Sequence, residues 1–154
     1  MSDIGSDGNL LYCTFRLAGR LFGVDMRAVK EVNTRTALTP VPHAPPAVSG
    51  LVNLRGQLHL VLDLRRLLGL GESAVTADSR LVIFKPAVGE SFGVLADAVG
   101  DVVRLDPAQT ERYAADDPAR AGGLLIGVGK TEGDLMVIVD PYRLLEAVGR
   151  EKTA

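Results

Sequence analysis

The sequence predicts an all-β fold, and three observations support this prediction. Short apolar runs recur along the 154 residues, and in residues 11–17 the apolar side chains alternate with the period of two that is typical of a strand with one buried face. Residues that favour turns separate these runs. Segments with helical spacing are few and short. Many short strands at fairly even spacing favour small barrels or a sandwich.

The first two predicted strands form a hairpin. In residues 11–17 the apolar side chains at alternate positions share one face, and Ala18-Gly19-Arg20 predicts a turn into a second strand over residues 21–24. Further strands are predicted at residues 51–54, 58–62, 81–84, 92–95, 102–105, 124–128 and 135–139. Turns between them are predicted at Arg55-Gly56, between Pro86 and Gly89, and at Glu132-Gly133-Asp134.

Three short helices are predicted from residues that cap helix ends. Asp25 is placed to cap a helix over residues 26–32, in which Met26, Val29 and Val32 share one side. Asp63 precedes a helix over residues 64–68, which Gly69 ends. Asp140-Pro141 opens a helix over residues 142–148, with Gly149 after it.

The chain repeats itself in two halves. Phe22-Gly23-Val24 returns 70 residues later as Phe92-Gly93-Val94. Farther on, four residues return after 77 positions, namely Gly50 as Gly127, Gly56 as Gly133, Leu58 as Leu135 and Asp63 as Asp140. We interpret this as duplication of a β unit of about half the chain. Residues shared by both halves are expected to serve folding. Where the halves differ, as at Arg55 and Glu132, a residue is free to serve a partner or is simply a solvated turn residue.

Composition limits the class of protein. Hydrophobic residues make up 47% and charged residues 23% of the chain, which is typical of a globular domain. A net charge of −2 with 5% aromatic residues argues against a nucleic-acid surface. The single cysteine, Cys13, permits neither an internal disulfide nor a cysteine zinc site. The longest uncharged run, residues 37–54, contains four prolines and cannot form a membrane helix.

The ends of the chain are expected to lie outside the domain. The polar, acidic residues 1–9 lack the features of a signal peptide, and we expect a disordered leader there. The domain is then expected over residues 10–148, with a frayed tail over 149–154. The expected location is the cytoplasm.

Catalytic chemistry has little support in the sequence. His43 and His59 match no usual metal-ligand spacing, and Cys13 alternates with apolar residues as a buried side chain does. Helix capping explains three of the five candidate aspartates, which are Asp25, Asp63, Asp97, Asp101 and Asp140. We therefore expect no catalytic, cofactor or metal site. The competing enzyme hypothesis requires Asp63, Asp97 and Asp140 to meet in one cleft.

Two blocks together are specific enough to indicate a family. They are Asn53-Leu54-Arg55-Gly56 and Val61-Leu62-Asp63-Leu64-Arg65. With weaker matches on both sides, they make residues 10–145 resemble the CheW family of chemotaxis coupling proteins. The chain departs from the family pattern at Asn33, His59 and Leu60, where arginine, an apolar residue and proline are usual.

The resemblance implies two SH3-like five-stranded β-barrel subdomains around a shared hydrophobic core, with a few short helices. It also implies a non-catalytic adaptor without cofactors. The implied partners are the cytoplasmic tip of a chemoreceptor (methyl-accepting chemotaxis protein) and the regulatory domain of a CheA-type histidine kinase, with no nucleic acid and no membrane insertion. Such a protein is cytoplasmic and is recruited to receptor arrays. Two alternatives remain: an adaptor of a non-flagellar pathway, serving twitching motility or second-messenger control, and a stand-alone domain that inhibits a kinase.

The resemblance also assigns a receptor-facing surface. It comprises Val29 and Glu31, expected on the first short helix, together with Asn53, Arg55 and Gly56 at the turn and Val102 in the second half. A helical receptor tip favours an apolar groove with charged residues at its rim. Val29 and Val102 are expected either to line that groove or to lie in the core, and Arg55 is expected to anchor the partner. Kinase contacts are expected on exposed strands.

Overall fold

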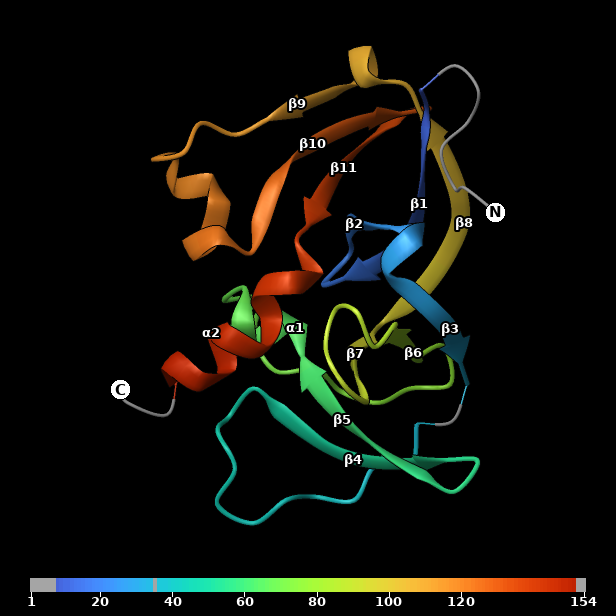
Figure 1. Cartoon of the computed structure of the whole chain (residues 1–154), viewed down its shortest axis with the longest axis vertical. Helices are drawn as coiled ribbons and strands as arrows, with labels where there is room; N and C mark the ends of the chain where they lie inside the picture. Colours follow the sequence, from blue (N-terminus) through green and yellow to red (C-terminus); the bar gives the residue numbers. More distant parts are fainter. Residues whose placement is uncertain (1–7, 35, 152–154) are drawn as a thin grey trace.

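The chain folds into two β-sheets linked by short helical segments (Figure 1). The computed structural model describes residues 8–34 and 36–151. The six-stranded sheet has the order β8 (Ala98–Leu105), β1 (Leu10–Leu17), β2 (Arg20–Asp25), β11 (Asp134–Val139), β10 (Leu125–Thr131), β9 (Thr110–Arg112). The five-stranded sheet has the order β3 (Val29–Asn33), β6 (Arg80–Phe84), β7 (Phe92–Ala96), β5 (Gln57–Asp63), β4 (Val48–Leu54).

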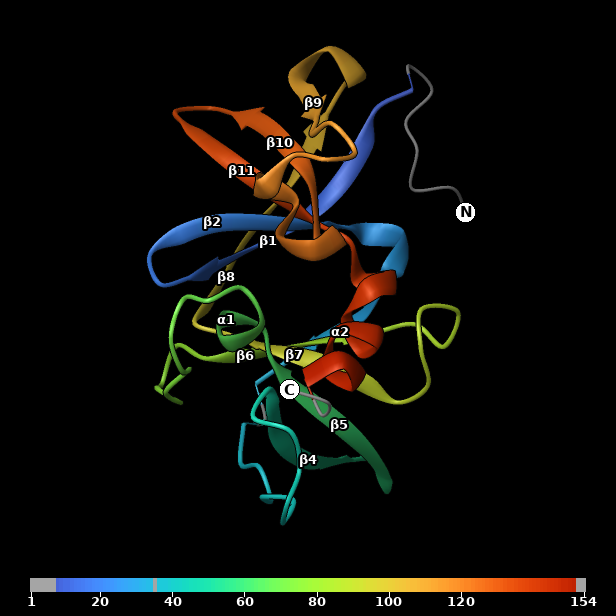
Figure 2. The same ribbon diagram turned by 90° about the vertical axis from the view of Figure 1, so that its left-hand side faces the viewer.

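Helical segments in the described residues are short and connect or cover the strands. They are η1 (Met26–Ala28), α1 (Leu64–Leu67), η2 (Pro107–Gln109), η3 (Pro118–Gly123), η4 (Pro141–Arg143) and α2 (Leu144–Glu151). Figure 2 shows the two sheets one above the other, with α1 and α2 near their junction. The all-β prediction with a few short helices is confirmed.

Each half of the sequence contributes one hairpin to the sheet that is otherwise built from the other half. The β1–β2 hairpin comes from the first half but pairs with β8 and β11 of the second half. The β6–β7 hairpin comes from the second half but pairs with β3 and β5 of the first. Each sheet is therefore built from both halves, and neither repeat unit corresponds to one sheet.

The exchange follows the repeat found in the sequence. Phe22 of β2 pairs in parallel with Val137 of β11, and its counterpart Phe92 of β7 pairs in parallel with Leu60 of β5. The order β8-β1-β2-β11-β10 thus matches β3-β6-β7-β5-β4 strand for strand. The sixth strand, β9, corresponds to an isolated bridge between Thr39 and Leu51 beside β4. These equivalent pairings support duplication.

The main hydrophobic core lies between the sheets. Buried side chains from both sheets form one cluster, including Phe15 and Phe22 from the first sheet and Phe84 and Phe92 from the second. Leu144 of α2 is fully buried in the same cluster. Two smaller clusters belong to the individual sheets. The shared core expected from the resemblance is therefore present.

Three expected features differ from the structure. The helix over residues 26–32 is wrong, because η1 ends at Ala28 and Val29–Asn33 forms β3 against β6. The last helix does not stop before Gly149, since α2 runs to Glu151, into the segment expected to be a tail. Strand β9 was not predicted. The expected leader at 1–7 and the last residues, 152–154, lie outside the described residues.

Candidate functional site

The turn between β4 and β5 holds three of the predicted site residues. Leu54 pairs with Gln57, which leaves Arg55 and Gly56 as a two-residue turn. Their φ angles are +53° and +84°, as a type I′ turn requires. The backbone N–H of Gly56 donates a 2.9 Å hydrogen bond to Oδ1 of Asn53. Asn53 and Gly56 therefore fix the turn that carries Arg55.

Glu31 on β3 is the charge partner of Arg55. Nη1 of Arg55 donates a 3.3 Å hydrogen bond to Oε1 of Glu31, and Nη2 donates to Oε2. Nδ2 of Asn33 donates a further bond of 3.0 Å to Oε1. Hydrogen bonds from Arg55 and then from Asn33 lower the pKa of Glu31. The same pair raises the pKa of Arg55.

The Arg55–Glu31 pair joins two elements that are far apart in the sheet. Strand β3 is one edge of the five-stranded sheet, and β4 is the other. A contact from the β4–β5 turn to β3 is possible only because the sheet curls until its edges approach each other. The side chain of Arg55 is nevertheless 64% exposed, against 23% for Glu31. The ion pair therefore stands at the surface, accessible to a partner.

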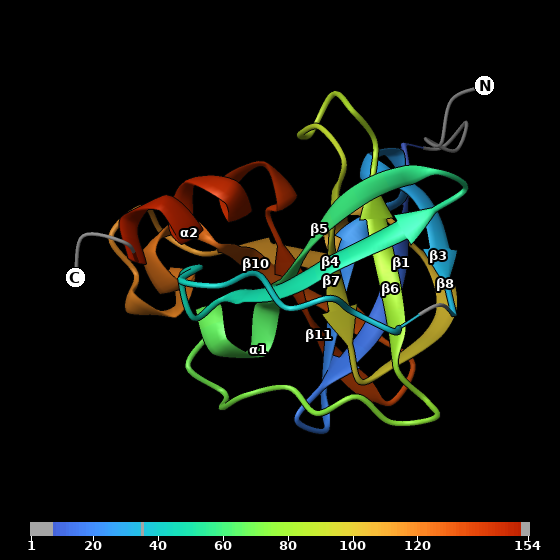
Figure 3. The same cartoon turned by 90° about the horizontal axis from the view of Figure 1, so that it is seen from below.

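The two valines take different positions. Val29 is 6% exposed and packs in the main core. Of the two positions expected for it, groove or core, the structure shows the core, where its side chain anchors β3. Val102 on β8 is 53% exposed. Strands β3 and β8 follow one another along the same side of the molecule in both Figures 1 and 3. The structure thus gathers Glu31, Asn53, Arg55 and Gly56 and leaves Val102 on the other sheet.

Two residues near this surface were not among the predicted site residues. Asn33 is one of the two side chains that fix the Glu31 carboxylate. It lies two residues from Glu31 on β3 and so on the same face. Val32 is 42% exposed on the same strand. The two-residue spacing could have identified Asn33 only if the segment had been recognised as a strand.

The aspartates of the enzyme hypothesis hold separate structural contacts. Asp63 accepts a bond from the backbone N–H of Arg66 at the start of α1, and Asp140 accepts one from Tyr142 in η4. Asp97 accepts one from the backbone N–H of Ala18. Each of these carboxylates is thus used by a different segment of the fold, and within residues 8–34 and 36–151 no three His, Cys, Asp or Glu side chains are placed to hold a metal ion.

His59 and Leu58 occupy opposite environments. His59 is 3% exposed, with Nδ1 lying 3.1 Å from the carbonyl oxygen of Gln57. Leu58 is 58% exposed and Leu135, its repeat counterpart, is 56% exposed. The expectation that residues shared by both halves serve folding is therefore wrong at this leucine.

In the described part of the chain, no helix has the length and apolar character to cross a membrane.

Two interleaved sheets that share one hydrophobic core define an all-β fold with a charged hairpin turn at its surface. The chain belongs to the family described as CheW-like domain, whose model matches residues 11–149. It is 33% identical over 150 residues to "Chemotaxis protein CheW" of Rhizobium meliloti (strain 1021), covering 95% of this chain and 94% of that protein. It is 35% identical over 122 residues to "Protein FrzA" of Myxococcus xanthus, covering 78% and 74%.

A solved structure has the same fold. The crystal structure of scaffolding protein TtCheW from Thermoanaerobacter tengcongensis superimposes with a TM-score of 0.77 at 29% identity, covering 88% of this chain and 86% of that one. This similarity confirms the fold expected from the resemblance.

Proposed function

We propose that this chain is a non-catalytic adaptor that couples the cytoplasmic tips of chemoreceptors to the regulatory domain of a CheA-type histidine kinase. Membership of the CheW-like family and the relative named as a chemotaxis protein support this role. The scaffolding protein of the same fold supports it as well. In this role the chain works in the cytoplasm and is recruited to receptor arrays.

The observation that carries the proposal is an ion pair that the fold does not require. At the repeat-related positions of the other sheet, Arg55 is replaced by Glu132 and Glu31 by Asp101. Two acidic residues cannot form such a pair, yet the six-stranded sheet has the same strand order. A charged pair present in one sheet only, and exposed at the surface, is therefore free to serve recognition.

The proposed receptor surface is centred on this pair. Arg55 presents the guanidinium, whose fork of donors fits a carboxylate of a partner helix. Glu31 orients it, and Asn53 and Gly56 hold the turn. Val102 adds exposed apolar area on β8, while Val29 keeps β3 in place. Exposed apolar side chains beside a charged residue suit the surface of a helical hairpin.

A second pathway assignment rests on one observation. One alternative is an adaptor of a non-flagellar pathway such as twitching motility or second-messenger control, and the similarity to FrzA supports it only weakly. A stand-alone kinase inhibitor is the other alternative. Kinase activity measured with and without receptor separates these roles, because only an adaptor raises activity when the receptor is present.

The test uses charge exchange at the ion pair. Purified chain is sedimented with membranes that hold the receptor and kinase encoded beside its gene, and kinase activity is measured in the same mixture. Arg55→Glu is expected to lower receptor affinity about tenfold or more, as loss of a central charged contact does. The double variant Glu31→Arg with Arg55→Glu keeps an ion pair but exchanges the positions of the two charges. It is expected to bind the receptor as weakly as Arg55→Glu does.

Glu132→Ala, at the repeat-related turn, is the matched control and is expected to bind receptor as the unchanged chain does. Full recovery of receptor binding in the charge-exchanged variant would assign the pair a structural role and contradict the proposed surface. An unchanged chain that sediments with neither receptor nor kinase would contradict the adaptor function.

A further inference from the structure

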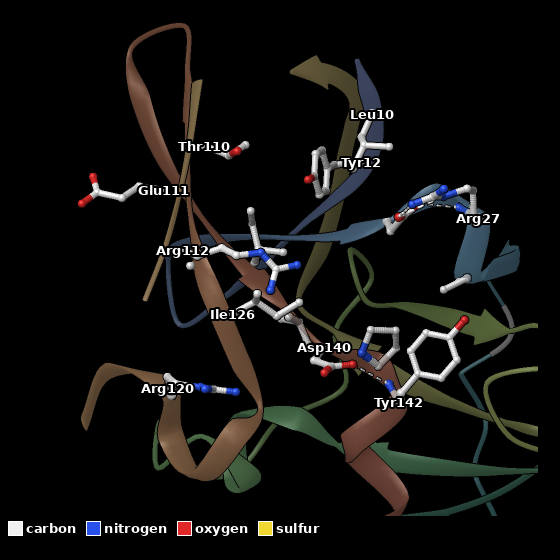
Figure 4. A pocket seen from close by; sticks show the side chains of 16 residues that line it. Leu10, Tyr12, Arg27, Thr110, Glu111, Arg112, Arg120, Ile126, Asp140 and Tyr142 are labelled. Atoms are coloured by element: carbon white, nitrogen blue, oxygen red, sulfur yellow. Dashed lines mark hydrogen bonds and ion pairs between the residues drawn. The ribbon is translucent and has the colours of Figure 1, made fainter. Parts of the chain in front are cut away.

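A cavity of about 580 Å³ opens within the six-stranded subdomain, away from the proposed receptor surface (Figure 4). Strands β1, β9, β10 and β11 and the start of η4 surround it. None of the six residues predicted for receptor binding lines it. The volume lies within the range of about 300–1,000 Å³ that is typical of small-molecule sites.

Apolar side chains form one part of the cavity wall. Leu10, Ile126 and Ile138 come from three different strands, and Pro141 and Tyr142 come from η4. Tyr142 is 61% exposed, so its ring stands at the mouth of the cavity. This wall can accommodate an aromatic or branched aliphatic group.

A tyrosine hydroxyl without a hydrogen-bond partner in the described part of the chain points into this cavity. Tyr12 is only 6% exposed, and Figure 4 shows its hydroxyl directed into the open space. The hydroxyl makes no hydrogen bond with any residue in the described part of the chain. Burial is the main cause that raises the pKa of Tyr12, so the group is a hydrogen-bond donor at neutral pH. The hydroxyl is therefore available to a bound ligand.

A guanidinium without an ion pair faces the same space. The exposed side chain of Arg112 on β9 points into the cavity (Figure 4), and its guanidinium forms no ion pair or hydrogen bond within residues 8–34 and 36–151. Arg120 lies beside it, and its only hydrogen bond in that part of the chain is a long one of 3.4 Å to the carbonyl oxygen of Ala115. Two cations therefore face a partly enclosed space.

The acidic side chains around the cavity do not neutralise these cations. Asp25 is paired with Arg27 at 2.6 Å. Asp140 accepts the backbone N–H of Tyr142 as the cap of η4 and lies 4.0 Å from Nε of Arg143. Glu111 points away from the cavity on the outer side of β9 (Figure 4). The unpaired charge inside is thus positive, and it calls for an anion.

We propose that this cavity binds a small organic anion, with its carboxylate or phosphate on Arg112 and the Tyr12 hydroxyl and its apolar body against Leu10, Ile126 and Ile138. Arg112 supplies the charge-assisted hydrogen bond, and Arg120 adds positive potential at the rim. The site is separate from the proposed receptor surface, because the two share no residue.

The test uses 8-anilinonaphthalene-1-sulfonate, a fluorescent aromatic anion, with the full chain. Saturable binding of one probe per chain is expected. Arg112→Ala is expected to raise the Kd of the probe about tenfold, and Tyr12→Phe, which removes only the hydroxyl, about threefold. Arg104→Ala is the matched control, because Arg104 is exposed on β8 and does not line the cavity. Arg55→Ala is expected to leave probe binding unchanged.

Competition identifies the chemistry of the ligand. Both 3-phenylpropionate and phenyl phosphate are tested as competitors, and displacement by one of them assigns the headgroup. The uncharged 3-phenyl-1-propanol is expected not to displace the probe at the same concentration. Equal displacement by the alcohol, or equal Kd values for the Arg112 and Arg104 variants, would overturn the proposal. Normal receptor binding in the same variants would show that the adaptor proposal stands separately.

Discussion

The carboxylate of Glu31 is held by two side chains that reach it from different parts of the chain. Asn33 comes from the same strand and Arg55 from a turn 24 residues away. Solvent screens an ion pair whose arginine is largely exposed, so such a pair adds little to folding. Its main consequence is orientation, because a guanidinium held at one position loses less freedom when a partner binds.

Titration of Glu31 predicts a pH-dependent contribution to stability. Its pKa in the folded chain lies below the ordinary value of 4.5, so folding is favoured by the ionised form. The contribution is fully present above the unfolded-state pKa and is lost as pH falls through the lower, folded-state pKa. Urea unfolding of the unchanged chain and of Glu31→Gln, from about pH 7 to about pH 3, is expected to give curves that converge at the acid end. A difference independent of pH would contradict this assignment.

The sequence identified one member of this pair better than the other. The charge reversal between Arg55 and Glu132 pointed to Arg55 from the residues alone. Glu31 was included only through the family resemblance, and it was expected on a helix. No local pattern connects Glu31 with Arg55, because the contact arises only when both edges of the sheet meet. Long-range contacts of this kind are not encoded in hydrophobic periodicity.

The segment after β2 shows how two patterns compete within one element. Asp25 caps η1, as its side chain accepts the N–H of Arg27, and Met26, Val29 and Val32 have helical spacing. The helix ends after one turn because Val29 pairs with Phe84 and packs in the core. β-Branched residues favour strands.

Strand β9, Thr110–Arg112, has no apolar residue and pairs only through its backbone with β10. Hydrophobic periodicity therefore gave no signal for this strand.

Alanine substitution at two repeat-related glycines, in the equivalent strands β2 and β7, is expected to reduce stability by different amounts. A Cβ at Gly93 would lie 2.4 Å from the carbonyl oxygen of Val82, which is backbone of the neighbouring strand. A Cβ at Gly23 would instead meet the flexible side chain of Met136. Gly93→Ala is therefore expected to lower the free energy of unfolding by about 2 kcal/mol or more, and Gly23→Ala by less. A Cβ at Gly149 in α2 would meet no atom within 4 Å, so Gly149→Ala is the control. Equal losses at Gly23 and Gly93 in urea unfolding would refute this.

The exposed leucines of the two hairpins predict tolerance to polar substitution. Leu58 and Leu135 occupy the same repeat position in β5 and β11, and each is more than half exposed. Leu58→Gln and Leu135→Gln are each expected to change the free energy of unfolding by no more than about 0.5 kcal/mol. Leu62→Gln, at a fully buried site, is the control and is expected to be severely destabilising. Chemical denaturation measures all three, and a large loss at either exposed leucine would place it in the core.

At the scale of the whole molecule, hairpin exchange makes the two sheets interdependent. Asp97 strengthens the link, because its carboxylate accepts a 2.8 Å bond from Ala18 in the β1–β2 turn and a 3.2 Å bond from Arg65 in α1. The residues repeated after 70 and 77 positions predicted two related β units, and the matching strand orders of the two sheets agree with this. The exchange itself was not predicted, since a strand has the same alternation whichever sheet it joins. The strand pairings show it, of β1 with β8 and β2 with β11 in one sheet and of β6 with β3 and β7 with β5 in the other.

This interdependence predicts that neither half of the sequence folds alone. Residues 1–76 carry β3, β4 and β5 without the β6–β7 hairpin that lies between β3 and β5, and residues 77–154 lack the β1–β2 hairpin between β8 and β11. Each fragment would expose strand edges and half of the shared core, which is too little buried surface for a stable fold. Circular dichroism of the separate fragments is expected to show unfolded chains, and an equimolar mixture is expected to regain the spectrum of the intact protein. The intact chain should unfold in a single calorimetric transition. A cooperative melting transition in either fragment alone would show that half of the sequence folds without the hairpin contributed by the other half, and it would contradict the exchange as the source of cooperativity.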